Sequence, residues 1–253
     1  MNFLDLIPKD IMYNYILLYL GSYSGILLYV NKNIKESVNN KVNKLKIKDF
    51  VGSIESIKWA LQNGCHWGRW TFSSAVEKGH LEVLKILQKN GCPWDEWSCS
   101  SAAKNGHFEI LKWLRKNGCP WDHWTCANAA KNGHFEILKW LRKNRCPWDE
   151  SSCSSAAQNG HLEILKWLRQ NGCPWCEFSC TNAAFNAQLD VLKWLRDNGC
   201  PWNEDTCMVT AQEGHLEILK WLRQNGCPWN KKSCVYVAEE NDHLEVLKWL
   251  SLE

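Results

Sequence analysis

Apolar and small residues recur at helical spacing in short segments that end at glycine. In one such segment, Cys99, Ala102, Ala103 and Gly106 fall at positions i, i+3, i+4 and i+7. This spacing places four small residues on one narrow helix face. Asp95 precedes the segment and suits the position before a first helical turn, whereas glycine suits the end of a helix. We therefore predict a short helix whose small face packs closely against a neighbouring helix.

A second helical segment follows after His107 and ends at Gly118. Its charged residues lie opposite an apolar arc, as in an amphipathic surface helix. The arc consists of Ile110, Leu111, Trp113 and Leu114. A Cys-Pro-Trp triplet then begins at Cys119, and its proline prevents the helix from continuing. Residues 95–118 are thus predicted to form one helix-turn-helix repeat.

This repeat recurs along most of the chain with a fixed period of 27 residues. Cys-Pro-Trp begins at Cys92, Cys119, Cys146, Cys173, Cys200 and Cys227, and a degenerate copy begins at Cys65. A fixed period of this size is typical of a solenoid, in which each repeat buries its faces on its neighbours. We predict an all-α solenoid of stacked helix-turn-helix repeats over residues 43–253, with about eight repeats. A leucine-rich repeat would need a strand of alternating leucines, which the helical spacing disfavours.

The composition adds 14 Cys and 17 Trp to an otherwise ordinary chain of 253 residues with a net charge of +3. Thirteen of the cysteines occupy two repeating positions, which is typical of small buried hydrophobes rather than of a disulfide framework. Cys176 completes a Cys-x-x-Cys motif with Cys173, but it takes the position that Asp or Asn holds in other repeats. We therefore expect reduced thiols in a cytoplasmic protein, with the nucleus left open, and neither zinc nor redox chemistry.

The histidines recur at the start of the second helical segment, and none has a partner that the other repeats lack. The chain also has no glycine-rich phosphate loop and no metalloprotease or kinase motif. We predict no enzymatic activity, no cofactor and no metal site.

Residues 102–109, with the sequence Ala-Ala-Lys-Asn-Gly-His-Phe-Glu, and the later Asn117-Gly118 pair resemble an ankyrin repeat. The family's usual period is 33 residues, and the missing six fall where ankyrins carry a β-hairpin. The chain is therefore similar to the short-hairpin ankyrin arrays of large DNA viruses of amoebae. The resemblance implies that the histidine bridges turns by hydrogen bonds and that the first helices line the concave surface. Gln188 replaces this histidine in one repeat.

Residues 1–42 lack the repeat, and residues 11–30 contain no charged side chain, which raises the question of a membrane helix. Polar and glycine residues interrupt that stretch, and the first residues lack the basic character of a signal peptide. Two short helices are the better prediction. A membrane segment, a hydrophobic cap for the first repeat and a third interpretation from resemblance remain open.

That third interpretation is an F-box, because residues 7–32 resemble its Leu-Pro-x-Glu-Ile, Ile-Leu, Leu-Leu and Val-x-Lys pattern. The spacing slips by about one residue relative to the family. F-boxes dock on the Skp-family adaptor of SCF-type ubiquitin ligases. The resemblance would place Pro8, Ile11, Ile16, Leu17 and Leu20 at that contact.

A ladder of lysines along the second helices, with arginines beside it, could form a phosphate track. Each of these lysines, however, has Glu or Asp three residues earlier, which is the spacing of a pair on one helix face. We therefore predict a solvated face, and a nucleic-acid-binding solenoid is kept only as a third functional alternative.

On the first helices, the side opposite the small face varies from repeat to repeat. Its aromatic and amide residues include Trp70, Trp97, Trp124, Asn128, Phe178, Asn182, Phe185 and Tyr236. Exposed aromatic residues are typical of binding hot spots, although these indoles could instead pack on the Pro-Trp linker of a neighbouring repeat. We predict a monomeric protein-interaction module that binds a protein partner here. It is a substrate receptor of a ubiquitin ligase if residues 1–42 are an F-box, and a plain scaffold or decoy otherwise.

Overall fold

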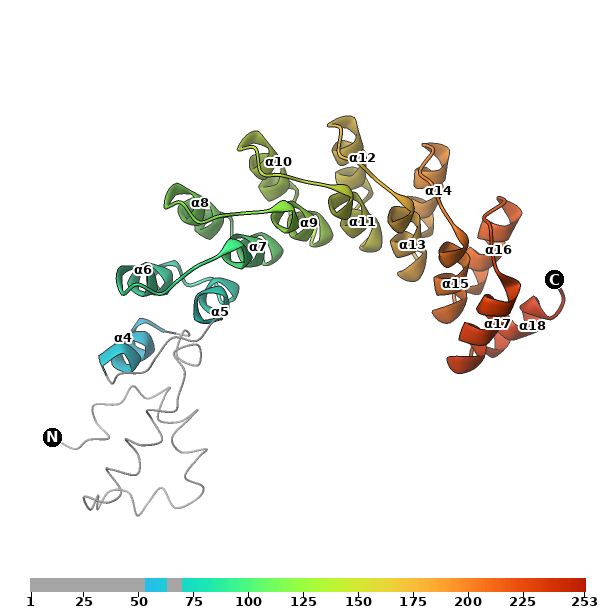
Figure 1. Cartoon of the computed structure of the whole chain (residues 1–253), viewed down its shortest axis with the longest axis horizontal. Helices are drawn as coiled ribbons and strands as arrows, with labels where there is room; N and C mark the ends of the chain where they lie inside the picture. Colours follow the sequence, from blue (N-terminus) through green and yellow to red (C-terminus); the bar gives the residue numbers. More distant parts are fainter. Residues whose placement is uncertain (1–52, 63–69) are drawn as a thin grey trace, which may run out of the picture. The chain divides into compact units, whose positions relative to one another are not determined.

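The computed structural model describes residues 53–62 and 70–253, and these residues form fifteen α-helices and no strand. The helices are α4 (Ile54–Gln62), α5 (Thr71–Glu77), α6 (Leu81–Lys89), α7 (Glu96–Lys104), α8 (Phe108–Lys116), α9 (His123–Lys131), α10 (Phe135–Lys143), α11 (Glu150–Gln158), α12 (Leu162–Gln170), α13 (Glu177–Phe185), α14 (Leu189–Asp197), α15 (Glu204–Gln212), α16 (Leu216–Gln224), α17 (Lys231–Glu240) and α18 (Leu244–Leu250). Odd numbers are the first helices of the repeats and even numbers the second helices (Figure 1). The predicted all-α solenoid is confirmed for this part of the chain.

The described residues fall into two compact units. Unit 1 contains those up to Ala102 together with Glu109–Cys119, and so holds α4, α5, α6 and most of α7 and α8. Unit 2 contains Ala103–Phe108 and Pro120–Glu253, and so holds α9 to α18.

Within unit 2, the first helices α9, α11, α13, α15 and α17 pack side by side in chain order, and each packs on its own second helix (Figure 1). The small face explains this close stacking. In α9, Cys126, Ala129 and Ala130 are buried, and side chains of this size let neighbouring helices approach closely. The second helices bury their branched residues on the same core, as Ile137 and Leu138 do in α10. The hydrophobic pattern thus accounts for both rows.

The Cys-Pro-Trp linkers are held by an aromatic ladder. Trp175 meets the edge of Trp194 on the next second helix, with ring centroids 6.0 Å apart. The Arg169 guanidinium of the preceding second helix lies 4.0 Å from the centroid of the same Trp175 ring. Trp–Trp pairs of this kind are Trp94–Trp113 in unit 1 and Trp121–Trp140, Trp148–Trp167, Trp202–Trp221 and Trp229–Trp249 in unit 2. Ring pairs and cation–π contacts stabilise such linkers beyond simple burial.

The arginines correct the expectation of a wholly solvated face. Arg196 lies over Trp202 at 3.7 Å and also donates from Nη1 to the Cys200 carbonyl at 2.7 Å. The lysines behave as predicted where pairs are observed, since Lys112 and Lys220 contact the glutamates three residues earlier, at 2.5 and 2.8 Å. The arginines beside the lysine ladder therefore help to hold the linkers in place.

The histidines join successive repeats in unit 2. His161 Nε2 lies 3.1 Å from the carbonyl of Lys131, the last residue of the preceding first helix. The ring fills the space above Gly133, where an added Cβ would come within 2.9 Å of His161 Cε1. Three further histidines make the same carbonyl contact, namely His134 with Lys104, His215 with Phe185 and His243 with Gln212. This repeated contact, here called the histidine clamp, has the bridging role that the resemblance implied.

The described cysteines are free thiols, and all of them except Cys176 are buried, as predicted. The Cys173 thiol donates to the Asp149 carbonyl at 3.3 Å, and other linker cysteines make the same contact one repeat further along. A hydrogen bond with Cys173, together with burial, raises the pKa of the Cys153 thiol. Burial raises the pKa of Cys92 to about 11. Thiols in this state are structural, because the thiolate is the reactive form.

Candidate functional surface

The aromatic residues on the varied side of the first helices are exposed. In unit 1, Trp70 and Trp97 expose 47% and 46% of their surface. In unit 2, Trp124 exposes 44% and is flanked by the His123 ring, whose centroid lies 5.1 Å away. The remaining exposed aromatic residues of this side are Phe178, Phe185 and Tyr236, all in unit 2. Each of these side chains therefore has surface available to a partner.

The contrast with the other tryptophans is informative, because the linker and second-helix indoles are half-buried partners in the aromatic ladder. Trp97 and Trp124 sit opposite the small face of their helices, where Cys99 and Cys126 are buried. Their exposure therefore follows from their position on the helix. Large aromatic side chains that the fold leaves uncovered are candidates for partner contacts.

The predicted amide residues lie on the same helices. Asn128 on α9 and Asn182 on α13 are half-buried. Phe185, the last residue of α13, is 36% exposed and forms part of the lining of an open groove. The predicted adaptor contacts Pro8, Ile11, Ile16, Leu17 and Leu20 lie outside the described residues, as does the candidate membrane stretch.

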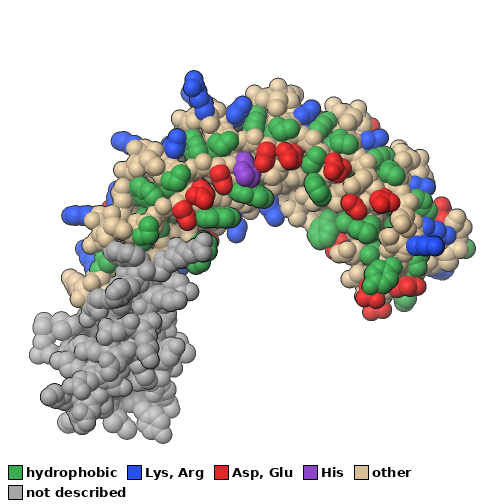
Figure 2. Space-filling view, in the orientation of Figure 1, with side chains coloured by type: hydrophobic (Ala, Val, Ile, Leu, Met, Phe, Trp, Pro, Cys, Tyr) green, Lys and Arg blue, Asp and Glu red, His purple; other side chains and the backbone are tan. Residues whose placement is uncertain are grey.

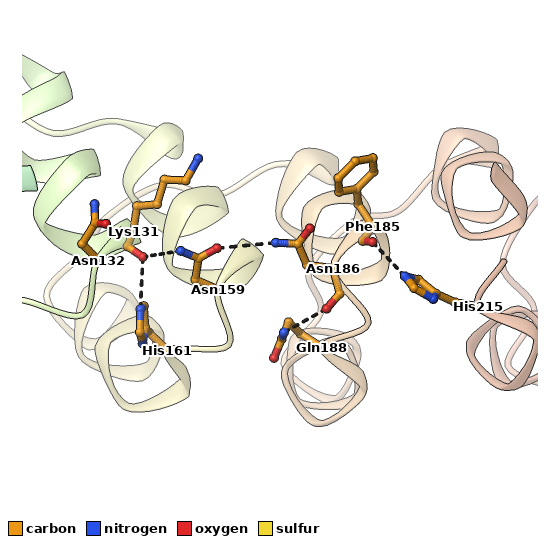
Figure 3. A pocket seen from close by; sticks show the side chains of 8 residues that line it. All are labelled: Lys131, Asn132, Asn159, His161, Phe185, Asn186, Gln188 and His215. Atoms are coloured by element: carbon orange, nitrogen blue, oxygen red, sulfur yellow. Dashed lines mark hydrogen bonds between the residues drawn. The ribbon is translucent and has the colours of Figure 1, made fainter. Parts of the chain in front are cut away.

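The groove of about 690 Å³ lies in unit 2, where the first helices α9, α11 and α13 end (Figure 3). It is lined by Lys131, Asn132, Asn159, His161, Phe185, Asn186, Gln188 and His215. Asn159 donates from Nδ2 to the Lys131 carbonyl at 2.7 Å, and Asn186 donates to the Asn159 side chain at 3.5 Å. The amides thus link successive repeats, beside the histidine clamp. Their polar groups suit contact with the backbone or polar side chains of a protein segment.

Sequence reasoning missed this groove. Its signal was the asparagine that follows the first helix in several repeats, at residues 105, 132, 159 and 186. The groove is also lined by Gln188, the residue that replaces the repeated histidine. Gln188 lies over Gly160 of the preceding repeat, as histidine lies over the equivalent glycine, but its amide donates to the Asn186 carbonyl of its own turn at 2.9 Å.

Family models identify the repeats. One described as "Ankyrin repeats (3 copies)" matches residues 99–177, and one described as "Ankyrin repeats (many copies)" matches residues 72–115. The repeats within residues 72–177 thus match ankyrin repeats. The crystal structure of the human ASB11 ankyrin repeat domain is similar in fold, with a TM-score of 0.51 and 20% sequence identity over 71% of this chain and 96% of that one. No curated protein matches the sequence.

Ankyrin repeats indicate a protein–protein interaction module whose partner is unspecified. In this array the linkers between second and first helices contain no strand within the described residues, as at residues 144–149 between α10 and α11. Strand hairpin tips are therefore not among the surfaces that these described residues offer for recognition.

Two further features concern the described residues as a whole. Residues 53–62 and 70–253 contain no group of three or more His, Cys, Asp or Glu side chains arranged to hold a metal ion. In the same ranges, no helix has the length and apolar character that crossing a bilayer requires.

Charge is unevenly distributed over the two rows of unit 2. The first helices α11, α13 and α15 contain Glu150, Glu177, Glu204 and Asp205 and no Lys or Arg. The second helices are mixed, since α12 and α16 each contain one Glu, one Lys and one Arg, and α14 contains two Asp, one Lys and one Arg. Figure 2 shows the acidic side chains as a row across unit 2. The first-helix face is thus both aromatic and acidic.

Proposed function

We propose that this ankyrin array captures a protein partner on its first-helix face. The observation that carries the proposal is the exposure of Trp97 in unit 1 and of Trp124 and Phe178 in unit 2, each at 44% or more. Interface hot spots are enriched in tryptophan and are centred on such side chains. The face named here consists of the varied side of the first helices and the adjoining groove.

The test is affinity capture from a eukaryotic lysate with the full chain as bait, compared with a variant in which Trp97, Trp124 and Phe178 are changed to Ser. We expect the variant to lose the captured proteins while its far-UV circular dichroism and melting temperature stay unchanged. A matched control changes Leu244 and Leu252, which are 73% and 82% exposed, to Ser. Equal loss of partners in both variants, or unfolding of the first variant alone, would contradict the proposal.

We further propose that residues 1–42 form an F-box that links the array to a ubiquitin ligase, with the array as substrate receptor. The support is the resemblance of residues 7–32 to the F-box pattern. Changing Ile16, Leu17 and Leu20 to Asp in the full chain should abolish capture of the Skp-family adaptor and cullin while other partners remain. If neither protein is captured by the unchanged chain, residues 1–42 have another role and the protein is a plain scaffold.

The period of 27 residues is the basis for proposing the class of partner. Arrays of this short type are common in large DNA viruses of amoebae, so a host protein in the cytoplasm is the partner class we propose.

A further inference from the structure

We propose that the acidic row on α11, α13 and α15 binds a segment of the partner that is rich in Lys or Arg, with Phe178 as its aromatic contact. This inference rests on the proposed function and specifies the partner's chemistry. It concerns unit 2 alone, because all of these residues lie there.

The acidic residues are not a requirement of the fold. Acidic side chains in a first turn stabilise any helix through its dipole, so they could have a purely local role. Yet α9, in the same row, has no acidic residue in its first turn, and α17 begins with Lys231 and Lys232 instead. The acidic first turns of unit 2 are therefore confined to three consecutive first helices, and the repeat folds without them.

The acidic residues of the two rows also differ in their partners. On the second helices, Glu163 and Glu217 pair with the lysines three residues later, at 2.7 and 2.8 Å. Among the described residues, no salt bridge engages Glu150, Glu177 or Glu204. The first-helix row thus presents carboxylates that the chain itself does not neutralise, and a cationic segment would complement them.

The exposed aromatic side chain lies next to the acidic row, because Phe178 follows Glu177 at the start of α13, which packs beside α11. Cys176 precedes α13, and its pKa is raised first by burial, with the Glu177 and Glu150 carboxylates adding to the rise. Phe178, two residues after Cys176, exposes 56% of its surface. An Arg or Lys side chain over an exposed phenyl ring gains a cation–π contact. The neighbouring Glu177 carboxylate would attract the same cation.

The row has a defined end. Lys231 and Lys232 at the start of α17 are both exposed and would repel a cationic segment. The structure therefore assigns the basic segment to α11, α13 and α15, which lie side by side, and excludes its continuation over α17.

The test is fluorescence anisotropy of the full chain with a labelled peptide in which arginine alternates with glycine. The same peptide with glutamate for arginine is the negative probe. The test variant carries Glu150→Gln, Glu177→Gln and Glu204→Gln. The control variant removes the same charge from the second helices through Glu163→Gln, Asp190→Asn and Glu217→Gln. A fourth protein carries Phe178→Ser.

We expect the arginine peptide to bind the unchanged chain with an affinity that falls as salt is raised, and the glutamate peptide not to bind. The test variant loses three exposed ion pairs with the peptide, so it should bind about tenfold more weakly. The Phe178→Ser protein loses the cation–π contact and should bind about threefold more weakly. The control variant should bind within about twofold of the unchanged chain. Circular dichroism confirms that each variant is folded.

Failure of the arginine peptide to bind the unchanged chain overturns the inference, and so does equal weakening in the test and control variants. The proposed function fails separately. If a captured partner is lost with Phe178→Ser but retained by the triple glutamine variant, the face binds a protein whose chemistry is not basic. In that case this inference is wrong and the proposed function stands.

Discussion

The histidine clamp makes a quantitative prediction because the chain provides its own control. We expect His161→Ala to lower the free energy of unfolding by about 2 kcal/mol. The hydrogen bond from the ring to the Lys131 carbonyl, at 3.1 Å, contributes about 1 kcal/mol. Loss of the half-buried ring from its place on Gly133 adds about 1 kcal/mol. The carbonyl keeps its second donor, Asn159 at 2.7 Å, so the cost of an unpaired buried group is not added.

Gln188→Ala is the matched control. Gln188 occupies the equivalent position, but its amide donates at 2.9 Å to Asn186 within the same turn, so it makes no such bond to the preceding repeat. A local bond of this kind is worth about 0.5 kcal/mol, and loss of the side chain from its place on Gly160 adds about 0.5 kcal/mol, so the loss should be about half of that for His161→Ala. The reverse substitution, Gln188→His, should raise the free energy of unfolding by about 1 kcal/mol, because it introduces a hydrogen bond between repeats.

The assay is urea unfolding followed by far-UV circular dichroism, in which a midpoint shift at constant slope reports the change in stability. Equal losses for His161→Ala and Gln188→Ala would refute the reasoning. A Gln188→His variant that is no more stable than the unchanged chain would also refute it. Either result would mean that the hydrogen bond between repeats contributes nothing to the free energy of unfolding.

Three other predictions concern stability. Arg145 has a φ of 62° where equivalent repeats have glycine with open space around it, so Arg145→Gly should raise the free energy of unfolding by about 1 kcal/mol in urea titrations. Trp175→Ala should lower it by about 3 kcal/mol, whereas Trp124→Ser should change it by less than about 0.5 kcal/mol; equal losses would show that Trp124 is core. Cys92 and Cys234 have pKa values raised from 9.0 to about 11, so the unfolded chain loses protons first. Stability should then fall as the pH rises from about 9 to about 11, and flat melting temperatures across that window would contradict this.

Much of the fold follows from the residues because the period repeats every local signal several times. The helix pattern predicted for residues 95–118 appears as α7 and α8, with the second helix ending before Gly118. The small face and the buried thiols were also predictable. A position that holds Cys or Ala in almost every repeat has the same buried environment in each of them. The exposure of Trp97 and Trp124 could not be predicted from the sequence, because it depends on how far the next linker reaches across the helix.

The interactions between repeats were the least predictable from the sequence. A Lys and an Arg spaced along one helix suggest a solvated face, and only the path of the linker brings Arg196 over Trp202. The groove beside Asn159 arises from the ends of three helices that are 27 residues apart in sequence. Such surfaces depend on stacking geometry, which a single repeat does not contain.

The central claim is that the first-helix face holds the partner, and site-specific photo-crosslinking tests it most directly. A benzophenone amino acid would replace Phe178 on α13 in one protein and Leu244 on α18, a second helix, in another. Leu244 is the more exposed of the two, at 73% against 56%, so exposure alone would favour it. The account predicts covalent partner adducts from position 178 and none from position 244. Adducts from position 244 alone would contradict it.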